Sequence, residues 1–295
     1  MNVLVIGATG YIGRATTAAL QRAGHAVTAL VRPGSEGKLP VGASRATGDV
    51  SDLASLTAAA TDMDAVLYAV QFNGAGDQFE VESAALRCLA EALAPRGAAL
   101  VYTSGVWLYG STYPRVIDET FPENPTPLVA KRPLLERIVL DACARGLRGI
   151  VIRPGDVYGA GGGIPAMWVH AARTDGAARI VGEGGNHWPM VHLDDLAQLF
   201  VLAIERAKAG SAYIAVDDAQ LTVRAMAEAA SRGAGAGGAV TVWPVEEARG
   251  TLGLFADALV LDQAATSAKA RAELGWTTRA TTAIDDLQGG SYVSG

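Results

Sequence analysis

The first residues of the chain place an apolar run, a glycine-rich turn and a helical stretch in direct succession. Val3-Leu4-Val5-Ile6 has the length and composition of a buried strand, and residues 12–23 have a helical pattern that ends at Gly24. Between them lies Gly7-Ala8-Thr9-Gly10-Tyr11-Ile12-Gly13. A strand, a glycine turn and a helix in this order are typical of a site where free N–H groups and the helix dipole face a phosphate. The N-terminal part of the chain is therefore predicted to be a nucleotide-binding β–turn–α unit.

The glycines of this turn have different expected roles. Gly7 permits the tight turn, Gly10 lets a pyrophosphate approach the backbone, and Gly13 lets the helix pack on its strand. The residues that we expect to contact a dinucleotide here are Gly7, Thr9, Gly10, Tyr11, Ile12 and Gly13.

Strand-like and helix-like segments alternate through the first half of the chain. Strand-like runs occur at residues 3–6, 26–31, 65–70, 98–103 and 149–153, and helical patterns lie between them. Such alternation implies right-handed crossovers and a parallel sheet that helices cover on both faces. The fold class is therefore predicted to be α/β.

Composition limits the partners and the compartment. The net charge is −6, no long basic run is present, and no apolar run is long enough to span a bilayer. The two cysteines, Cys88 and Cys143, are typical of thiols in a reduced compartment, not of a disulfide framework or a metal site. We expect a cytoplasmic protein, monomeric or homodimeric, that binds a small-molecule substrate and no nucleic acid, membrane or metal.

Further motifs follow along nearly the whole chain. They are Gly48-Asp49-Val50, residues 64–70, residues 102–110, Ile152-Arg153-Pro154-Gly155-Asp156-Val157-Tyr158-Gly159, residues 191–195 and residues 270–276. In this order, and with the GxxGxxG turn, they resemble the extended or atypical short-chain dehydrogenase/reductase family, which includes NAD-dependent epimerases and dehydratases.

The resemblance implies a Rossmann-type, doubly wound parallel sheet and a smaller C-terminal substrate lobe. Residues 1–154 would form the dinucleotide-binding domain, and late elements around 190–216 would return to it. Residues 155–295 would form mostly the substrate-binding lobe. The further residues implied in the dinucleotide site are Asp49, Val50, Ala69, Val70, Thr103, Lys131, Pro154 and Val157.

The end of the second strand bears on the choice of cofactor. An acidic residue there favours NAD, because it binds the ribose hydroxyls. Val31 occupies this place and Arg32 follows it. Because a guanidinium matches a phosphate through two charge-assisted hydrogen bonds, we predict that NADP(H) is preferred over NAD(H).

The catalytic pattern of the family is incomplete in this chain. The family usually has a tyrosine four residues before a lysine, and the tyrosine exchanges a proton with the substrate oxygen. Counting back from Lys131 gives Pro127, and counting back from Arg132 gives Leu128. The place of the family's catalytic serine or threonine falls on Gly105. Two catalytic side chains are therefore missing.

Four residues remain as catalytic candidates. Either Lys131 or Arg132 can hold the nicotinamide ribose, and the sequence leaves both open. Ser104 retains a hydroxyl near the expected site, although alternation along the strand lets only one of Thr103 and Ser104 face the cofactor. Tyr158 is a candidate for a relocated acid, because ligands bind at the carboxyl edge of such sheets.

Large apolar and aromatic residues favour a flat, hydrophobic substrate. Between Gly155 and Gly185 the only cations of the Arg and Lys type are Arg173 and Arg179, which is few for holding a second pyrophosphate of a sugar nucleotide. The candidate substrate-binding residues are Phe72, Trp107, Tyr109, Tyr158, Trp168 and His187.

These features predict an NADP(H)-dependent oxidoreductase that reduces a small hydrophobic or aromatic substrate without the usual tyrosine acid. An iminium ion needs only hydride, a conjugated alkene can be protonated later by water, and a carbonyl group needs a proton donor. Two alternatives stay open: a nucleotide-binding redox sensor or regulator, and a non-redox isomerase, epimerase or cyclase that retains bound NAD(P).

Overall fold

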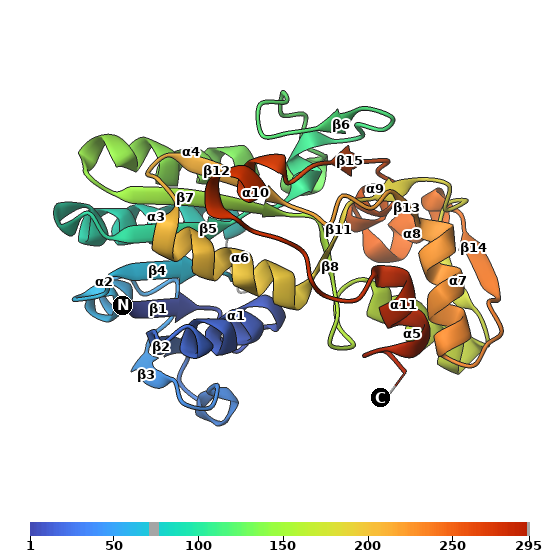
Figure 1. Ribbon diagram of the computed structural model, residues 1–295, viewed down its shortest axis with the longest axis horizontal. Coiled ribbons are helices and arrows are strands. Elements are labelled where there is room, and N and C mark those ends of the chain that lie inside the picture. The colour runs from blue at the N-terminus through green and yellow to red at the C-terminus, as the bar shows by residue number, and fades with distance from the viewer. Residues whose placement is uncertain (71–76, 294–295) are drawn as a thin grey trace.

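A seven-stranded parallel sheet forms the centre of the larger part of the molecule (Figure 1). The computed structural model describes residues 1–70 and 77–293. The strand order is β12-β7-β5-β4-β1-β2-β3, and every pair is parallel. The strands are β1 (Asn2–Ile6), β2 (Ala26–Val31), β3 (Ser44–Thr47), β4 (Ala65–Tyr68), β5 (Ala99–Thr103), β7 (Arg148–Pro154) and β12 (Ser211–Ala215). The predicted α/β class and doubly wound sheet are confirmed.

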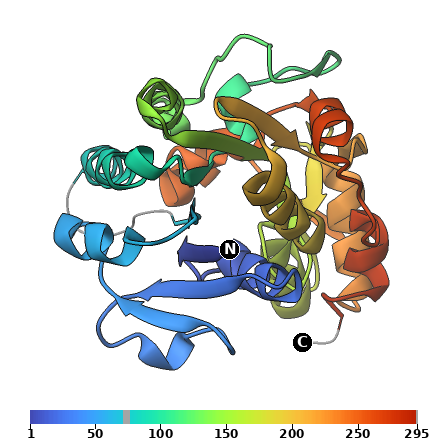
Figure 2. The same cartoon turned by 60° about the vertical axis from the view of Figure 1, so that its left-hand side comes forward.

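Helices cover both faces of this sheet, as the turned view in Figure 2 shows. One face is covered by α1 (Tyr11–Arg22) and α6 (Leu193–Arg206), and the other by α2 (Leu53–Ala60), α3 (Gln78–Leu93) and α4 (Arg132–Asp141). Both faces are buried, so the strands are continuous apolar runs instead of alternating ones. In β1, Val3 and Val5 enter one core while Leu4 and Ile6 enter the other.

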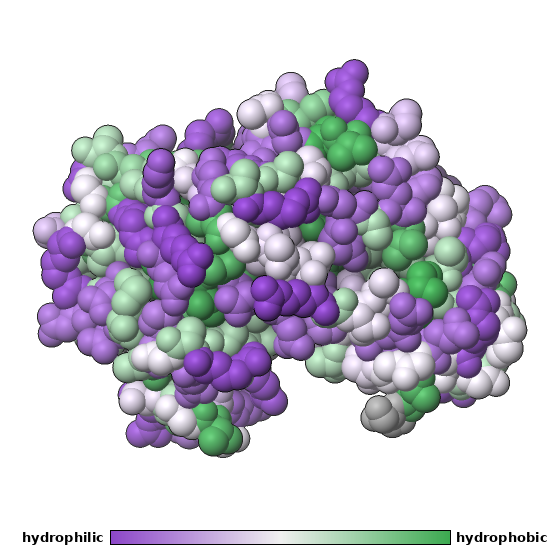
Figure 3. Space-filling view, in the orientation of Figure 1, coloured by the Kyte–Doolittle hydropathy of each residue, from purple (hydrophilic) through white to green (hydrophobic). Residues whose placement is uncertain are grey.

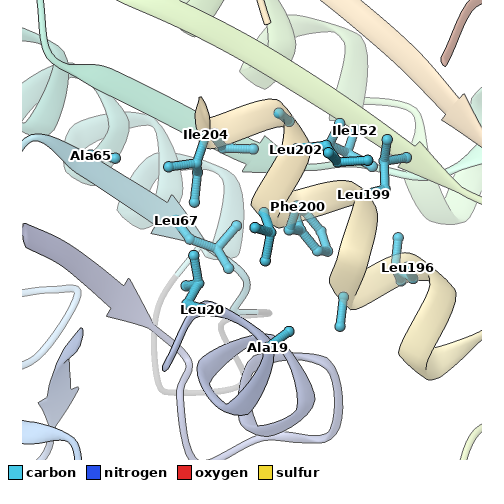
Figure 4. Close-up of a cluster of buried hydrophobic side chains, with 14 of the residues drawn as sticks. Ala19, Leu20, Ala65, Leu67, Ile152, Leu196, Leu199, Phe200, Leu202 and Ile204 are labelled. Atoms are coloured by element: carbon cyan, nitrogen blue, oxygen red, sulfur yellow. The ribbon is translucent and has the colours of Figure 1, made fainter. Parts of the chain in front are cut away.

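The core under α6 illustrates how the layers are held (Figure 4). Leu20 of α1, Leu67 of β4 and Phe200 of α6 are fully buried and pack together between the sheet and the two helices. Burying each such side chain contributes on the order of 1.5–3 kcal/mol. This packing fixes α1, and with it the glycine turn, against the sheet.

The smaller lobe has its own core, around Trp168, Trp188 and Met226. Its helices are α5 (Pro165–Asp175), α7 (Val223–Gly233), α8 (Val245–Leu252), α9 (Phe255–Leu259) and α11 (Ala283–Gly289). Its strand pairs are β9 (Ala178–Val181) with β14 (Val240–Trp243), and β10 (His187–Trp188) with β13 (Leu221–Thr222). Figure 1 shows this lobe on the right of the sheet.

Two short parallel pairs lie outside these sheets: β8 (Asp156–Tyr158) with β11 (Met190–His192), and β6 (Val116–Ile117) with β15 (Ala264–Ala265). The chain also returns to the larger part twice. It first forms α6 and the edge strand β12, and then α10 (Ala268–Leu274). Leu274 and Trp276 enter the same core as Phe200, a late return that the division at residue 154 did not include.

The exposed face seen in Figure 3 mixes hydrophilic and hydrophobic side chains across both parts of the molecule. Among the helices of residues 1–70 and 77–293, none combines the length and apolar character needed to cross a membrane.

Candidate functional site

The carboxyl ends of β1, β4, β5 and β7 lie next to one another at one edge of the sheet, because these strands are parallel neighbours. The glycine turn follows β1 there and touches the segment after β4. Gly7 has a φ of +95°, and a Cβ atom on it would lie 2.4 Å from the carbonyl oxygen of Ala69. The predicted contact residues Ala69 and Val70 therefore flank the turn.

The three glycines differ in what surrounds them. A Cβ atom on Gly13 would lie 2.1 Å from the Gly7 carbonyl oxygen, so Gly13 is needed for close packing of α1. A Cβ atom on Gly10 would meet only that same oxygen, at 3.3 Å, and the φ of Gly10 is −83°. The contact at Gly10 is tight but much longer than the one at Gly13, and no other heavy atom lies within 4 Å of this Cβ position, so open space lies in front of it.

This open space fits the pyrophosphate of a dinucleotide. Gly10 is the N-cap of α1 and has no side chain that could cap the first N–H groups of the helix. Tyr11 turns away from the space, because its hydroxyl donates a 2.6 Å hydrogen bond to the Gly159 carbonyl. Thr9 directly precedes Gly10 in the glycine turn, and Ile12 is the second residue of α1.

The ends of β2 and β3 supply the expected adenosine side of the site. Val31 is buried, so this position offers no carboxylate, whereas Arg32 is exposed. The Asp49 carboxylate accepts hydrogen bonds from the Ser51 amide at 2.9 Å and the Ser51 hydroxyl at 2.6 Å. These bonds hold the pKa of Asp49 below its usual value, and the nearby Arg32 charge acts in the same direction. Val50 is buried directly behind Asp49.

A cavity of about 540 Å³ opens at the ends of β5 and β7. It brings together many of the predicted residues and several that were not predicted. Its lining includes Asp77, Phe79, Glu82, Ser104, Gly105, Trp107, Leu128, Lys131, Arg132, Pro154, Asp156, Val157 and Ile164. Pro154 and Val157, two residues of the predicted dinucleotide site, bracket Asp156 on this wall.

The structure distinguishes the two cations at the start of α4. The Arg132 guanidinium points inward and donates a 3.1 Å hydrogen bond to the Tyr102 hydroxyl and a 3.5 Å one to the Thr103 carbonyl. The Lys131 side chain is more than half exposed, pairs with Asp77 at 3.4 Å and lies over the Phe79 ring. Arg132 is therefore the cation at the inner end of the cavity. The corresponding tyrosine place is Leu128, which lines the same cavity.

Two hydroxyls follow one another at the end of β5. The Thr103 and Ser104 hydroxyls are both buried and have no hydrogen-bond partner among the described residues. Only Ser104 of the two lines the cavity. Trp107 lines it as well, and its ring packs against Phe255 of the lobe at 5.9 Å.

Asp156 lines the cavity but was not among the residues predicted from the sequence. Its carboxyl group is buried, and its Oδ2 atom has no hydrogen-bond partner within residues 1–70 and 77–293. Burial raises the pKa of Asp156 to about 7, and the polar influence of Trp107 lowers it only in part. An acidic residue directly after an apolar strand, between Pro154 and Val157, was the signal available in the sequence.

Several predicted substrate residues lie elsewhere. Tyr158 is buried in the lobe, and its hydroxyl donates a 2.7 Å hydrogen bond to the Thr281 carbonyl, so it does not line the cavity. The Tyr109 hydroxyl is buried against the Arg153 guanidinium, which is also bound by Glu136. Both tyrosines therefore have structural partners in place of a substrate.

Trp168 and His187 are also separated from the cavity. Trp168 stacks on Trp188 at 5.3 Å and lines a different, apolar cavity of about 650 Å³ inside the lobe. The His187 Nδ1–H group donates a 2.9 Å hydrogen bond to the Asp262 carboxylate, and the imidazole ring stacks on Tyr113 at 4.0 Å. Phe72 lies outside the described residues. No cluster of three metal-ligating side chains occurs in the part of the chain that the structure describes.

Comparisons with known proteins agree on one family. A model of the NAD dependent epimerase/dehydratase family matches residues 3–216. The uncharacterized protein C2A9.02 of Schizosaccharomyces pombe is 29% identical, over 99% of this chain and 100% of that one. A 3-diazoavenalumate denitrifying reductase of a Streptomyces species is 30% identical, over 74% of this chain and 77% of its own.

Other similarities are more distant. A 2-alkyl-3-oxoalkanoate reductase of Stenotrophomonas maltophilia is 26% identical, over 76% of this chain and 73% of its own. The structure of UDP-glucose 4-epimerase from Thermus thermophilus, in complex with NAD, superposes with a TM-score of 0.79 at 21% identity, over 98% and 99% of the two chains. The glycine cradle, the strand order and the match over residues 3–216 lead to one conclusion: the chain belongs to the NAD-dependent epimerase/dehydratase family of extended short-chain dehydrogenases/reductases, whose typical cofactor is an NAD(P) dinucleotide.

Proposed function

We propose that this protein is an NADP(H)-dependent reductase of a small hydrophobic or aromatic molecule. The observation that carries the proposal is the cavity beside Arg132, where Leu128 stands in the place of the family's tyrosine. Together with Trp107, Val157 and Ile164, Leu128 makes much of its wall apolar. A flat or apolar acceptor is the kind of molecule that such a wall binds best.

The chain's own residues would hold the dinucleotide at three places. The open space at Gly10 would take the pyrophosphate, and the exposed guanidinium of Arg32 would pair with the 2′-phosphate. Arg132, fixed by Tyr102, would hold the nicotinamide ribose at the inner end of the cavity. When bound, the reduced dinucleotide supplies a hydride.

The remaining residues would act by position and by exclusion of water. Leu128 and Trp107 would orient the acceptor, and holding reactants in line is worth on the order of 7–11 kcal/mol in favourable cases. The relatives named as reductases act on different acceptors, a diazo compound in one and a 3-oxoalkanoate in the other. These names support reduction as the reaction, whereas the acceptor of this chain follows from its own cavity.

The test is a set of nucleotide-oxidation assays with the purified protein. NADPH is mixed with a β-keto ester, an aromatic ketone, an enone, a cyclic iminium ion and an aryldiazonium salt, and the loss of reduced nicotinamide is followed. We expect oxidation of NADPH faster than of NADH with at least one apolar acceptor. Tight binding of NADPH with no oxidation by any acceptor would support a sensor, and substrate conversion without nucleotide turnover would support an isomerase.

A further inference from the structure

The wall of the cavity contains one carboxyl group whose position is unusually fixed. The Asp156 amide donates a 2.8 Å hydrogen bond to the Pro189 carbonyl. The preceding Gly155 amide donates a 2.9 Å bond to Ala215, and a Cβ atom on Gly155 would lie 2.0 Å from the Pro189 oxygen. Hydrogen bonds to the residue before β11 and to the end of β12 therefore hold the backbone of Asp156 in place, directly after β7.

The side chain of Asp156 is buried but incompletely hydrogen-bonded. The Oδ2 atom of Asp156 has no hydrogen-bond partner in the described chain, and Trp107, itself a cavity residue, is the side chain that partly lowers its pKa. A buried carboxylate with an unsatisfied oxygen is costly, so the neutral acid is favoured. Unlike a carboxylate, a neutral carboxyl group has a proton to donate.

The charged groups around Asp156 do not reverse this preference. The same cavity contains Asp77 and Lys131, the N-cap residues of α3 and α4, together with Glu82 of α3 and Arg132 of α4. None of these four is a cause of its raised pKa, which comes from burial.

The neighbouring strands add two further titratable groups. His192 lies on β11, which pairs with β8, and Asp217 follows β12. The His192 Nδ1 atom accepts a 3.1 Å hydrogen bond from the Asp194 amide, and the Asp217 carboxylate accepts one of 2.9 Å from the Ala219 amide. Neither contributes to the raised pKa of Asp156.

We propose that the Asp156 carboxyl group is the proton donor to the acceptor, and that it takes over the task of the absent tyrosine. This inference rests on the proposed reductase function and assigns carbonyl groups as the natural acceptors. An iminium ion serves in the test as an acceptor that needs no proton. The acceptor carbon gains a hydride from the reduced nicotinamide dinucleotide, and the C=O π pair moves to the oxygen. That oxygen forms its O–H bond with the proton released by Asp156. The products are an alcohol, the oxidised dinucleotide and the Asp156 carboxylate, which is protonated again by water.

The kinetic test compares two asparagine variants. Asp156→Asn keeps the size and a hydrogen-bond donor but has no proton to transfer. Asp217→Asn is the matched control, because Asp217 is a partly buried aspartate whose pKa is also raised, to about 6, and which does not line the cavity. Single-turnover rates are measured with NADPH and ethyl acetoacetate, acetophenone and a cyclic iminium ion, from acid to alkaline pH.

We expect Asp156→Asn to lower the rate with ketones by about a hundredfold or more, the usual loss of a general acid, and to leave iminium reduction nearly unchanged. The wild-type ketone rate should fall as the pH rises through about 7, and Asp217→Asn should retain this profile. Ketone reduction that survives in Asp156→Asn would overturn the role of Asp156 but would leave the reductase proposal intact. A wild-type protein that reduces no acceptor would overturn the reductase proposal as well.

A second readout needs neither nucleotide nor acceptor. Infrared difference spectra of the ligand-free protein report the C=O stretch of protonated carboxyl groups as the pH is raised. We expect the wild-type protein and Asp217→Asn to share a band that disappears near neutral pH and that is absent from Asp156→Asn. Identical spectra for the wild type and Asp156→Asn would show that Asp156 is ionised throughout, and would refute the proposal.

Discussion

Replacing Asp156 by asparagine should change how the stability of the protein depends on pH. In the folded protein, burial raises the pKa of this carboxyl group from 3.8 to about 7. A raised pKa means that the folded state binds more protons than the unfolded state between these two values. The contribution of the Asp156 proton to the free energy of unfolding is therefore complete below about pH 4 and is lost progressively as the pH rises through 7.

The size of the effect follows from the shift. About three pKa units, at about 1.4 kcal/mol per unit, correspond to roughly 4 kcal/mol between the two limits. Between about pH 5 and about pH 8 the expected part is roughly 3 kcal/mol. This is a large fraction of the 5–15 kcal/mol that is typical of the free energy of unfolding of a domain.

The assay is urea unfolding of the wild type and Asp156→Asn across this pH range. Every other titrating group is common to the two proteins, so the difference between their unfolding free energies isolates Asp156. We expect the wild type to lose roughly 3 kcal/mol relative to Asp156→Asn as the pH rises. A difference that stays constant would refute the claim that Asp156 is buried as a neutral acid.

Four further substitutions test other parts of the site. Arg32→Ala should weaken NADPH binding by about 1.5–3 kcal/mol and leave NADH binding unchanged. If calorimetry shows that both nucleotides lose the same affinity, Arg32 does not contact the 2′-phosphate. Gly10→Val should abolish nucleotide binding in a folded protein, whereas Gly13→Val should unfold it, because its Cβ atom meets backbone at 2.1 Å. Tyr158→Phe should cost little in single-turnover rate, since its hydroxyl binds Thr281, and a loss of about a hundredfold would make Tyr158 the acid instead.

The sheet was predictable because its signals are local. The apolar runs of β1, β4, β5 and β7 are buried on both faces, and such runs stand out in the sequence. The edge strand β3 was missed, because Ser44–Thr47 is polar and largely exposed. The return of Trp276 to the core of the larger part was missed as well, because packing between distant segments leaves no local pattern.

The site was predictable where backbone geometry decides it. Gly7 and Gly13 are required by contacts that only glycine allows, and their spacing is visible in the sequence. The direction of a side chain is not visible in this way. Tyr158 and Asp156 belong to the same short strand, yet Tyr158 enters the lobe core and Asp156 lines the cavity. The unpartnered Oδ2 atom of Asp156 depends on how β7, β11 and β12 pack together, which the sequence does not show.

Transfer of a labelled hydride from NADPH to an acceptor is the decisive test of the proposed reductase function. NADPH carrying deuterium at the reactive nicotinamide carbon is incubated with the protein and an apolar carbonyl acceptor, and the product is analysed by mass spectrometry. We expect one deuterium on the former carbonyl carbon and a stoichiometric amount of oxidised dinucleotide. Bound NADPH that keeps its deuterium in the presence of every acceptor would contradict this function, and would leave a protein that binds the nucleotide without reducing anything.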